Sequence, residues 1–247
     1  MSLLSVRKLA RRYGGNLAVD DVSFDVMPGE ILGVMGANGA GKTTLFGMIA
    51  GNVKPSSGQI MLEGQAIQGQ PPERINALGV ARTFQIVRPF PGMSVLENVA
   101  VGAMYGRGRI ASPAAAREHA FELLRETGLA DRADLPASQL NLAGRKRLEI
   151  ARALATRPRL LLLDEVLAGL NATEVGAALE LICDVRQRYG LSIVIIEHVM
   201  KALMRLSDRI VVMHEGRKVV EGLPAEIAND PRVIKAYLGE RRHAVPA

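Results

Sequence analysis

A glycine-rich loop constrains this chain more than any other feature of its sequence. Gly36 and Gly41 flank four residues and are followed directly by Lys42 and Thr43. Glycines at this spacing let successive backbone N–H groups turn inward around a phosphate, the lysine supplies a cation, and the threonine offers Mg²⁺ an oxygen. The loop predicts a nucleoside triphosphate site whose candidate residues are Gly36, Asn38, Gly39, Ala40, Gly41, Lys42, Thr43 and Thr44.

The residues on either side of the loop support this interpretation. The apolar run 31–35 predicts a short buried strand, and the pattern from Lys42 to Ala50 becomes helical. A bound anion would therefore meet the positive end of a helix.

The rest of the chain alternates between strand-like and helix-like patterns. Val22, Phe24 and Val26 alternate with polar residues, which predicts a half-buried strand before the loop. The continuous apolar runs 160–163 and 193–196 are typical of central parallel strands covered on both faces. The helix expected between them has one apolar face, made of Val175, Leu179, Ile182, Val185 and Tyr189.

This order of elements predicts an α/β fold with a mostly parallel sheet, preceded by an N-terminal β subdomain. The segment 89–155 lacks strand-like runs and predicts an inserted helical subdomain. We therefore expect one domain with a nucleotide-binding core at 1–88 and 156–230, the insertion at 89–155, and a short C-terminal helix and tail at 231–247.

Two carboxylates form a second candidate site at the end of the run 160–163. Asp164 and Glu165 follow a buried strand, where charges need a metal, water or a cation as partner. Beside a triphosphate, Asp164 is expected to hold Mg²⁺ and Glu165 to deprotonate the attacking water. His198 follows the run 193–196 and is expected to donate a hydrogen bond to the γ-phosphate.

Composition excludes several classes of protein. No apolar run approaches the length of a membrane span, and the N-terminus has Arg7 too early for a secretory segment, so we expect a cytosolic protein. Its lone Cys183 cannot form an internal disulfide and is expected to be a buried structural thiol.

The net charge of +6 comes from arginine-rich segments such as 145–147. Solvated faces, a bound nucleotide or membrane lipid would explain this excess of positive charge as well as nucleic acid does. Aromatic residues are only 4% of the chain and do not interleave with the basic ones, which argues against nucleic-acid binding.

With these motifs, the chain from Leu3 to Glu240 resembles the ATP-binding subunit of an ABC transporter. The resemblance implies ATP and Mg²⁺ as cofactors and a fold made of an ABC ATPase cassette. It also implies that Tyr13 stacks on adenine. Gln85, within the stretch 81–85 (Ala-Arg-Thr-Phe-Gln), resembles the family's glutamine that touches Mg²⁺ and the attacking water.

A narrower resemblance is to the ATPases of branched-chain amino acid importers and of importers for related small polar solutes. Four stretches carry it: 81–85, 147–154 (Arg-Leu-Glu-Ile-Ala-Arg-Ala-Leu), 168–171 (Ala-Gly-Leu-Asn) and 233–239 (Val-Ile-Lys-Ala-Tyr-Leu-Gly). The last matches the short C-terminal helix typical of that subfamily.

One element departs from the family pattern. The family signature Leu-Ser-Gly-Gly-Gln aligns with residues 140–144, where this chain has Leu-Asn-Leu-Ala-Gly. In the family this segment caps the ATP bound to the opposite subunit. Asn141 can still donate a hydrogen bond, Ala143 adds a methyl group, and Gly144 restores a glycine one position later. Val166 also replaces the proline that usually follows the catalytic glutamate.

The resemblance implies ATP hydrolysis on the inner face of the cell membrane. The partners would be a second cassette, identical or different, and permease subunits that dock near 85–91; a periplasmic or extracellular solute-binding protein would take part indirectly. Two alternatives remain: an ATP-gated interaction protein with weak hydrolysis, and the ATPase of an exporter such as a lipopolysaccharide-type system. A DNA-repair ATPase is disfavoured because no sustained heptads separate Lys42 from Asp164.

Overall fold

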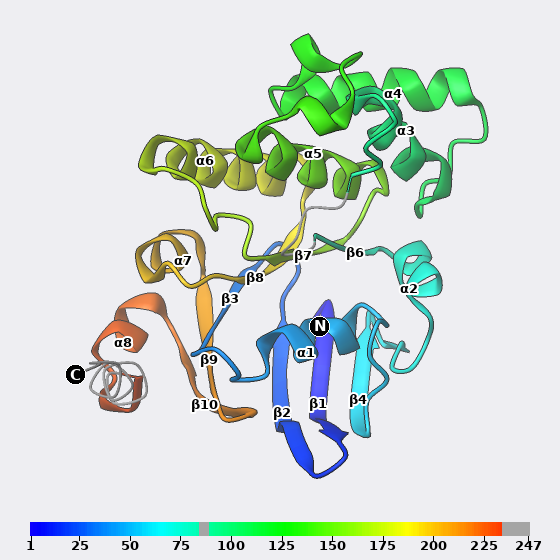
Figure 1. The fold of residues 1–247 in the computed structure, drawn as a ribbon. Helices are drawn as coiled ribbons and strands as arrows, with labels where there is room; N and C mark the ends of the chain where they lie inside the picture. The colour runs from blue at the N-terminus through cyan, green and yellow to red at the C-terminus, as the bar shows by residue number, and fades with distance from the viewer. Residues whose placement is uncertain (84–88, 234–247) are drawn as a thin grey trace. The chain divides into compact units, whose positions relative to one another are not determined.

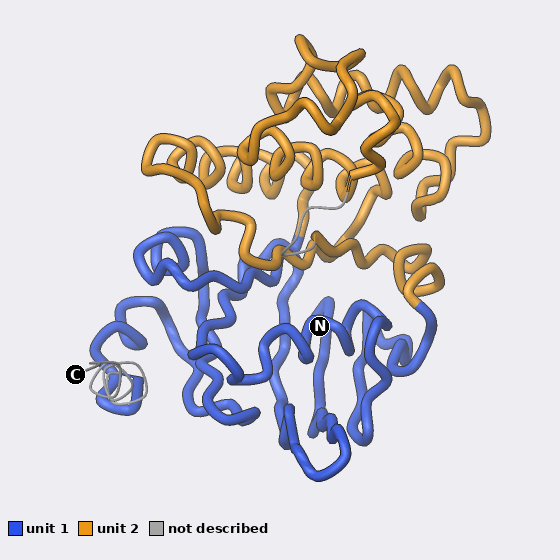
Figure 2. The backbone as a smooth tube through the Cα atoms, in the orientation of Figure 1, with its two compact units in different colours: residues 1–71, 192–247 blue, residues 72–191 orange. Residues whose placement is uncertain are grey.

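Two long antiparallel strands begin the computed structural model, which describes residues 1–83 and 89–233 (Figure 1). The chain divides into two compact units, residues 1–71 with 192–247 and residues 72–191 (Figure 2). The helical segment predicted at 89–155 lies entirely within the second unit.

The first unit is built on two sheets. Its elements are β1 (Leu4–Tyr13), β2 (Asn16–Val26), β3 (Ile31–Met35), α1 (Lys42–Ile49), β4 (Ser57–Leu62), β5 (Gln65–Ala66), β8 (Ser192–Ile196), α7 (Met200–Leu206), β9 (Arg209–His214), β10 (Arg217–Gly222) and α8 (Pro224–Asn229). The antiparallel sheet has the order β2-β1-β4-β5, and in the second sheet β3 lies between β8 and β9, parallel to both.

Burial explains why these segments form strands. Val22, Phe24 and Val26 of β2 are buried while the residues between them are half-buried, as the alternation predicts. Every residue of β3 and β8 is buried, which confirms the expectation for continuous apolar runs.

The second unit is mainly helical. Its elements are α2 (Pro72–Leu78), β6 (Val80–Arg82), α3 (Val95–Tyr105), α4 (Pro113–Glu126), the 3₁₀ turns Ala130–Arg132 and Ala137–Gln139, α5 (Leu142–Ala155), β7 (Leu160–Asp164) and α6 (Ala172–Tyr189). Polar residues fix where the helices begin. Ser94 and Glu97 form a capping box at the start of α3, and Asn171 and Glu174 form another at the start of α6. The strands β6 and β7 pair in parallel, with Arg82 opposite Leu162.

One expectation for α6 is wrong. Cys183 is exposed, because the buried face of the helix passes through Leu179, Ile182 and Val185, and one residue along a helix turns a side chain about 100° away. Tyr189, at the end of that face, is also partly exposed, and its hydroxyl donates a hydrogen bond to Glu126.

Candidate functional site

The predicted phosphate loop lies between β3 and α1. Gly41 is the residue before the helix and has φ of 95°, in the left-handed region that glycine adopts without strain. A Cβ at this position would lie 2.3 Å from the carbonyl oxygen of Ala18, so the backbone leaves no room for a side chain. With a glycine before it, α1 has no side-chain cap on its first N–H groups and no acidic residue in its first turn. Such a helix start is suited to binding an anion.

Lys42 supplies the positive charge of the loop. Its side chain is buried, at 5% exposure, and Nζ donates hydrogen bonds to the carbonyls of Gly36 (2.7 Å) and Ala37 (2.9 Å). Thr43, in the first turn of α1, is exposed and Thr44 is half-buried. The loop therefore holds its cation in place and presents a hydroxyl at the surface.

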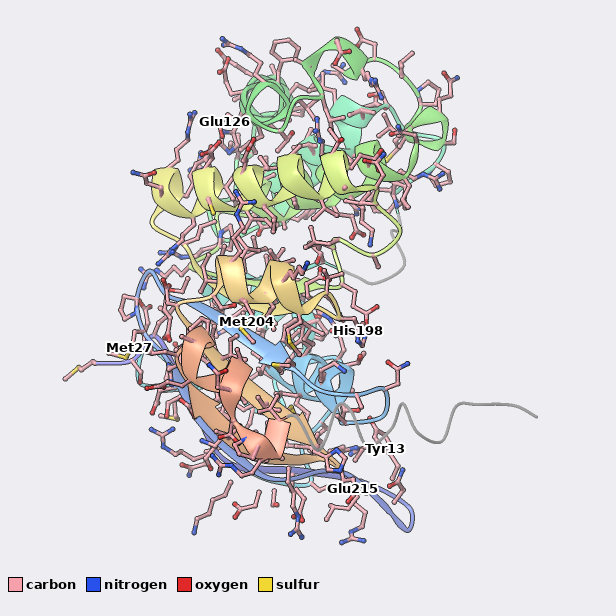
Figure 3. All side chains as sticks on the ribbon, turned by 90° about the vertical axis from the view of Figure 1, so that its left-hand side faces the viewer. Tyr13, Met27, Glu126, His198, Met204 and Glu215 are labelled. Atoms are coloured by element: carbon pink, nitrogen blue, oxygen red, sulfur yellow. The ribbon has the colours of Figure 1, made fainter. Side chains whose placement is uncertain are left out.

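The sheet of the first unit brings His198 to the same edge as the loop. Val34 of β3 is paired with Ile196 of the parallel strand β8, so Gly36 and His198 each follow a paired residue by two positions. His198 is exposed (Figure 3). The turn between β9 and β10 supports the loop as well, because Gly216 N donates to the Ala40 carbonyl at 3.2 Å.

Tyr13 ends β1 in the same unit and is 45% exposed (Figure 3). The guanidinium of Arg11 lies over its ring, 4.4 Å from the centroid. An exposed aromatic ring backed by a cation has the character of a stacking platform for a purine.

Asp164 ends β7 in the second unit and is 1% exposed. Its Oδ2 accepts a hydrogen bond from Arg82 Nη2 at 2.8 Å, and its backbone N donates to Thr83 Oγ1 at 3.2 Å. Among the described residues, the buried Oδ1 has no hydrogen-bond partner. A buried carboxylate at this point of the sequence calls for a metal, water or a cation, but no local pattern identifies Arg82 as the cation.

A buried carboxylate oxygen that accepts no hydrogen bond is a suitable ligand for Mg²⁺. This ion is usually bound through one or two carboxylates together with water and substrate phosphates, and does not need a cage of several protein ligands. The described part of the chain contains no group of three or more His, Cys, Asp or Glu residues that could hold a metal ion.

Glu165 is 9% exposed and has φ of 51°, which is uncommon for a residue other than glycine. Its backbone carbonyl accepts a hydrogen bond from Lys146 Nζ at 2.9 Å. The basic run 145–147 has several possible explanations in the sequence, among them a solvated face, but its central residue Lys146 is only 5% exposed. Its position four residues before the buried Ile150 on α5 could have indicated this.

The segment aligned with the family signature begins α5. Asn141 precedes the helix and its Oδ1 accepts a hydrogen bond from Gly144 N at 2.9 Å. The side chain is exposed, and its amide nitrogen keeps two N–H donors for a ligand. Ala143 is half-buried and Gly144 is buried. Asn141 therefore combines a helix cap with a surface donor.

Gln85 lies outside the described residues. A groove of about 270 Å³ in the second unit is lined by residues that include Phe90, Tyr105, Glu149 and Arg152. Phe90 and Tyr105 are exposed, at 43% and 74%, and the Arg152 guanidinium lies over the Phe90 ring. Burial lowers the pKa of Arg152, while the charge of Glu149 opposes the shift. The groove is therefore an apolar surface with a partly desolvated cation.

Among the described residues, no helix is both long and apolar enough to cross a membrane. The family model described as ABC transporter matches residues 19–168, and the one described as branched-chain amino acid ATP-binding cassette transporter matches residues 217–243.

The high-affinity branched-chain amino acid transport ATP-binding proteins LivG of Escherichia coli (strain K12) and BraF of Pseudomonas aeruginosa are 42% and 41% identical to this chain. Each match covers 96% of this chain and 98% of the relative. The ADP conformation of MJ1267, an ATP-binding cassette of an ABC transporter, superposes with a TM-score of 0.87 at 28% identity, over 97% of this chain and 99% of that one. The chain belongs to the ATP-binding cassette family of ABC transporters, which are ATPases coupled to transport.

Proposed function

We propose that this chain is the ATP-hydrolysing subunit of an importer for branched-chain amino acids or related small polar solutes. The observation that carries the nucleotide assignment is the start of α1, where uncapped N–H groups follow Gly41 and the buried Lys42 ammonium lies within the loop. The solute class is supported by LivG and BraF, whose names give branched-chain amino acid transport. In importers the solute contacts other subunits. The sequence of this chain therefore indicates which class of transporter it belongs to and does not identify the solute itself.

The roles of the loop follow from its residue types, and those of Tyr13 and Gln85 from the family resemblance. The loop residues 36–44 bind the phosphates, and Tyr13 stacks on the base. Thr43, Asp164 and Gln85 would hold Mg²⁺, for which Asp164 Oδ1 offers a buried acceptor. The ion would supply positive charge that offsets the charge of the phosphates.

The hydrolytic step uses three side chains, those of Glu165, His198 and Gln85. Glu165 accepts a proton from water as the water oxygen attacks the γ-phosphorus, and ADP departs as the bond to the γ-phosphate breaks. His198 donates a hydrogen bond to a γ-phosphate oxygen and stabilises charge there. Gln85 orients the water.

Two kinds of partner complete the proposal. A second cassette would receive Asn141, Ala143 and Gly144 against its own ATP, with the Asn141 amide as the donor. A permease on the inner face of the membrane would insert a helix into the groove beside Phe90 and Tyr105, whose exposed rings suit an apolar contact. The alternatives, an ATP-gated interaction protein and an exporter ATPase, have no feature of the described structure in their favour.

Substitution of Lys42 by alanine tests the nucleotide site. Loss of a charge-assisted hydrogen bond costs roughly 1.5–3 kcal/mol, so ATP affinity should fall about 10- to 100-fold while the fold persists. Titration calorimetry would measure the affinity, with the exposed Lys54→Ala as a matched control. Unchanged ATP affinity in a folded Lys42→Ala variant would contradict the assignment.

A further inference from the structure

One face of α5 rests on the segment that follows β7. Leu142 and Lys146 are four residues apart, so both lie on this face. Lys146 donates to the Glu165 carbonyl at 2.9 Å. Gly169 has φ of 80°, and a Cβ there would lie 2.8 Å from Leu142 Cδ2. The beginning of the helix therefore contacts the segment 165–169 at two points.

The Lys146 contact is more specific than packing requires. A buried ammonium is costly unless it is hydrogen-bonded, and the bond it makes is to one backbone carbonyl. The same Glu165 carbonyl accepts a bond from Ala168 N at 3.2 Å, which closes the first turn after β7. The ammonium thus fixes the backbone at the point where the strand becomes a turn.

The residue held in this way is under backbone strain. Glu165 has φ of 51°, and such a conformation persists only where the surroundings enforce it. Its side chain leaves the backbone in a direction set by that dihedral angle. A change of the angle would therefore move the carboxylate that we have assigned as the base.

We propose that Lys146 is a positioning residue for Glu165, and that it links the start of α5 to the catalytic carboxylate. The inference rests on the function proposed above. Asn141, at the start of α5, is assigned to the ATP of the opposite cassette, whereas Glu165 acts on the ATP of its own. If α5 shifts when Asn141 contacts the nucleotide of the partner cassette, the hydrogen bond from Lys146 to the Glu165 carbonyl would transmit that shift to the backbone of Glu165. Lys146 therefore gives the two nucleotides of a dimer a physical connection within one chain.

Steady-state kinetics of the full-length chain with ATP and Mg²⁺ test this. Lys146→Met keeps most of the apolar stem and removes the ammonium, so kcat should fall about tenfold, below the roughly 10²- to 10⁴-fold contribution of a general base. KM and the calorimetric ATP affinity should not change, because the residue does not bind nucleotide. Lys146→Arg should retain most of the activity. The exposed Lys54→Met is the matched control and should behave like the parent.

A double-substitution cycle separates positioning from general stability. If Lys146 acts through Glu165, Lys146→Met should not lower the residual rate of Glu165→Gln any further. Parental kcat in Lys146→Met, an equal fall in Lys146→Arg, or an additive loss in the double variant would each overturn the proposal. A parent chain that releases no phosphate would overturn both this proposal and the hydrolytic function. An active parent with a fully active Lys146→Met would overturn only the positioning role.

Discussion

Arg82 neutralises a carboxylate that is almost completely buried. Its Nη2 lies 2.8 Å from Asp164 Oδ2, with exposures of 10% and 1% for the two side chains. Removing one partner of such a pair leaves a buried charge uncompensated, which typically costs about 3–5 kcal/mol. We expect Arg82→Met to lower the thermal unfolding temperature clearly, and Arg82→Lys to lower it less. Differential scanning calorimetry would measure both, and an unchanged melting temperature in Arg82→Met would show that the pair contributes nothing.

His119 gives the second unit a dependence on pH. It lies on α4, its Nε2 is buried, and burial, followed by the positive charge of Arg157, lowers the pKa of its imidazole below 6.5 while Glu126 opposes the shift. With the pKa lower in the folded state, the unfolded chain binds more protons between the two values. The contribution of His119 to the free energy of unfolding is therefore fully present above about pH 6.5, and it declines as the pH falls toward the folded-state pKa.

The variant His119→Gln cannot titrate and should lose part of this dependence. Melting temperatures measured at about pH 7.5 and about pH 5.5 should differ less in the variant than in the parent, because the two pH values lie on either side of the ordinary histidine pKa. Equal differences in the two proteins would assign the acid sensitivity to other groups.

For single residues, the sequence predicted a role where that role depends on spacing over a few neighbouring positions. Lys42 belongs to a loop pattern eight residues long, and Asp164 directly follows an apolar run, so both could be identified without tertiary information. Arg82 and Lys146 could not be assigned their partners, because each pairs with a residue far along the chain. The roles of Tyr13, Gln85 and His198 stay predictions.

At the scale of the element, α5 depends on the cap that Asn141 provides. The side chain accepts the Gly144 N–H at 2.9 Å, and replacing such a cap by alanine typically costs about 1 kcal/mol. We expect Asn141→Ala to lower the free energy of unfolding by about this amount and Asn141→Ser, which can still accept the bond, to leave it nearly unchanged. Urea denaturation would compare them; a serine variant as unstable as the alanine variant would show that capping is not its structural role.

Elements with a strong periodic pattern were predicted well. The runs 160–163 and 193–196 are β7 and β8, and the apolar face through Leu179, Ile182 and Val185 is the buried face of α6. The three-residue β6 has too little sequence to show a period, and its existence depends on pairing with β7. The predicted burial of Cys183 is wrong because it rests on the apolar residues next to it in sequence. Burial on a helix depends on the angle of the residue around the helix axis.

At the scale of the whole molecule, the predicted unit of function is a pair of cassettes closed around ATP. Glu165→Gln keeps the size of the side chain but cannot readily accept a proton, so hydrolysis should fall roughly 10²- to 10⁴-fold. The step that separates the pair would then be slow. Size-exclusion chromatography with ATP and Mg²⁺ should show a dimer for this variant, and phosphate release should be detected only for the parent. A monomeric variant that still binds ATP would argue against closure by nucleotide.

The family could be recognised from the sequence because motifs spread over the chain agree with one another, and the matches to LivG and BraF confirm it. The sequence motifs that identify the family do not identify the transported solute. In the proposed importer the solute would contact other subunits, so no pattern of charge or burial in this chain would specify it.

The hydrogen bonds from Lys42 to the carbonyls of Gly36 and Ala37 have a kinetic consequence. They hold the loop in a defined shape, so much of the conformational entropy of ordering it is lost during folding, before a nucleotide binds. Nucleotide capture then requires little rearrangement. Differences in affinity between ATP, ADP and their analogues should consequently arise in the lifetime of the bound state, with encounter rates that are nearly the same for all of them.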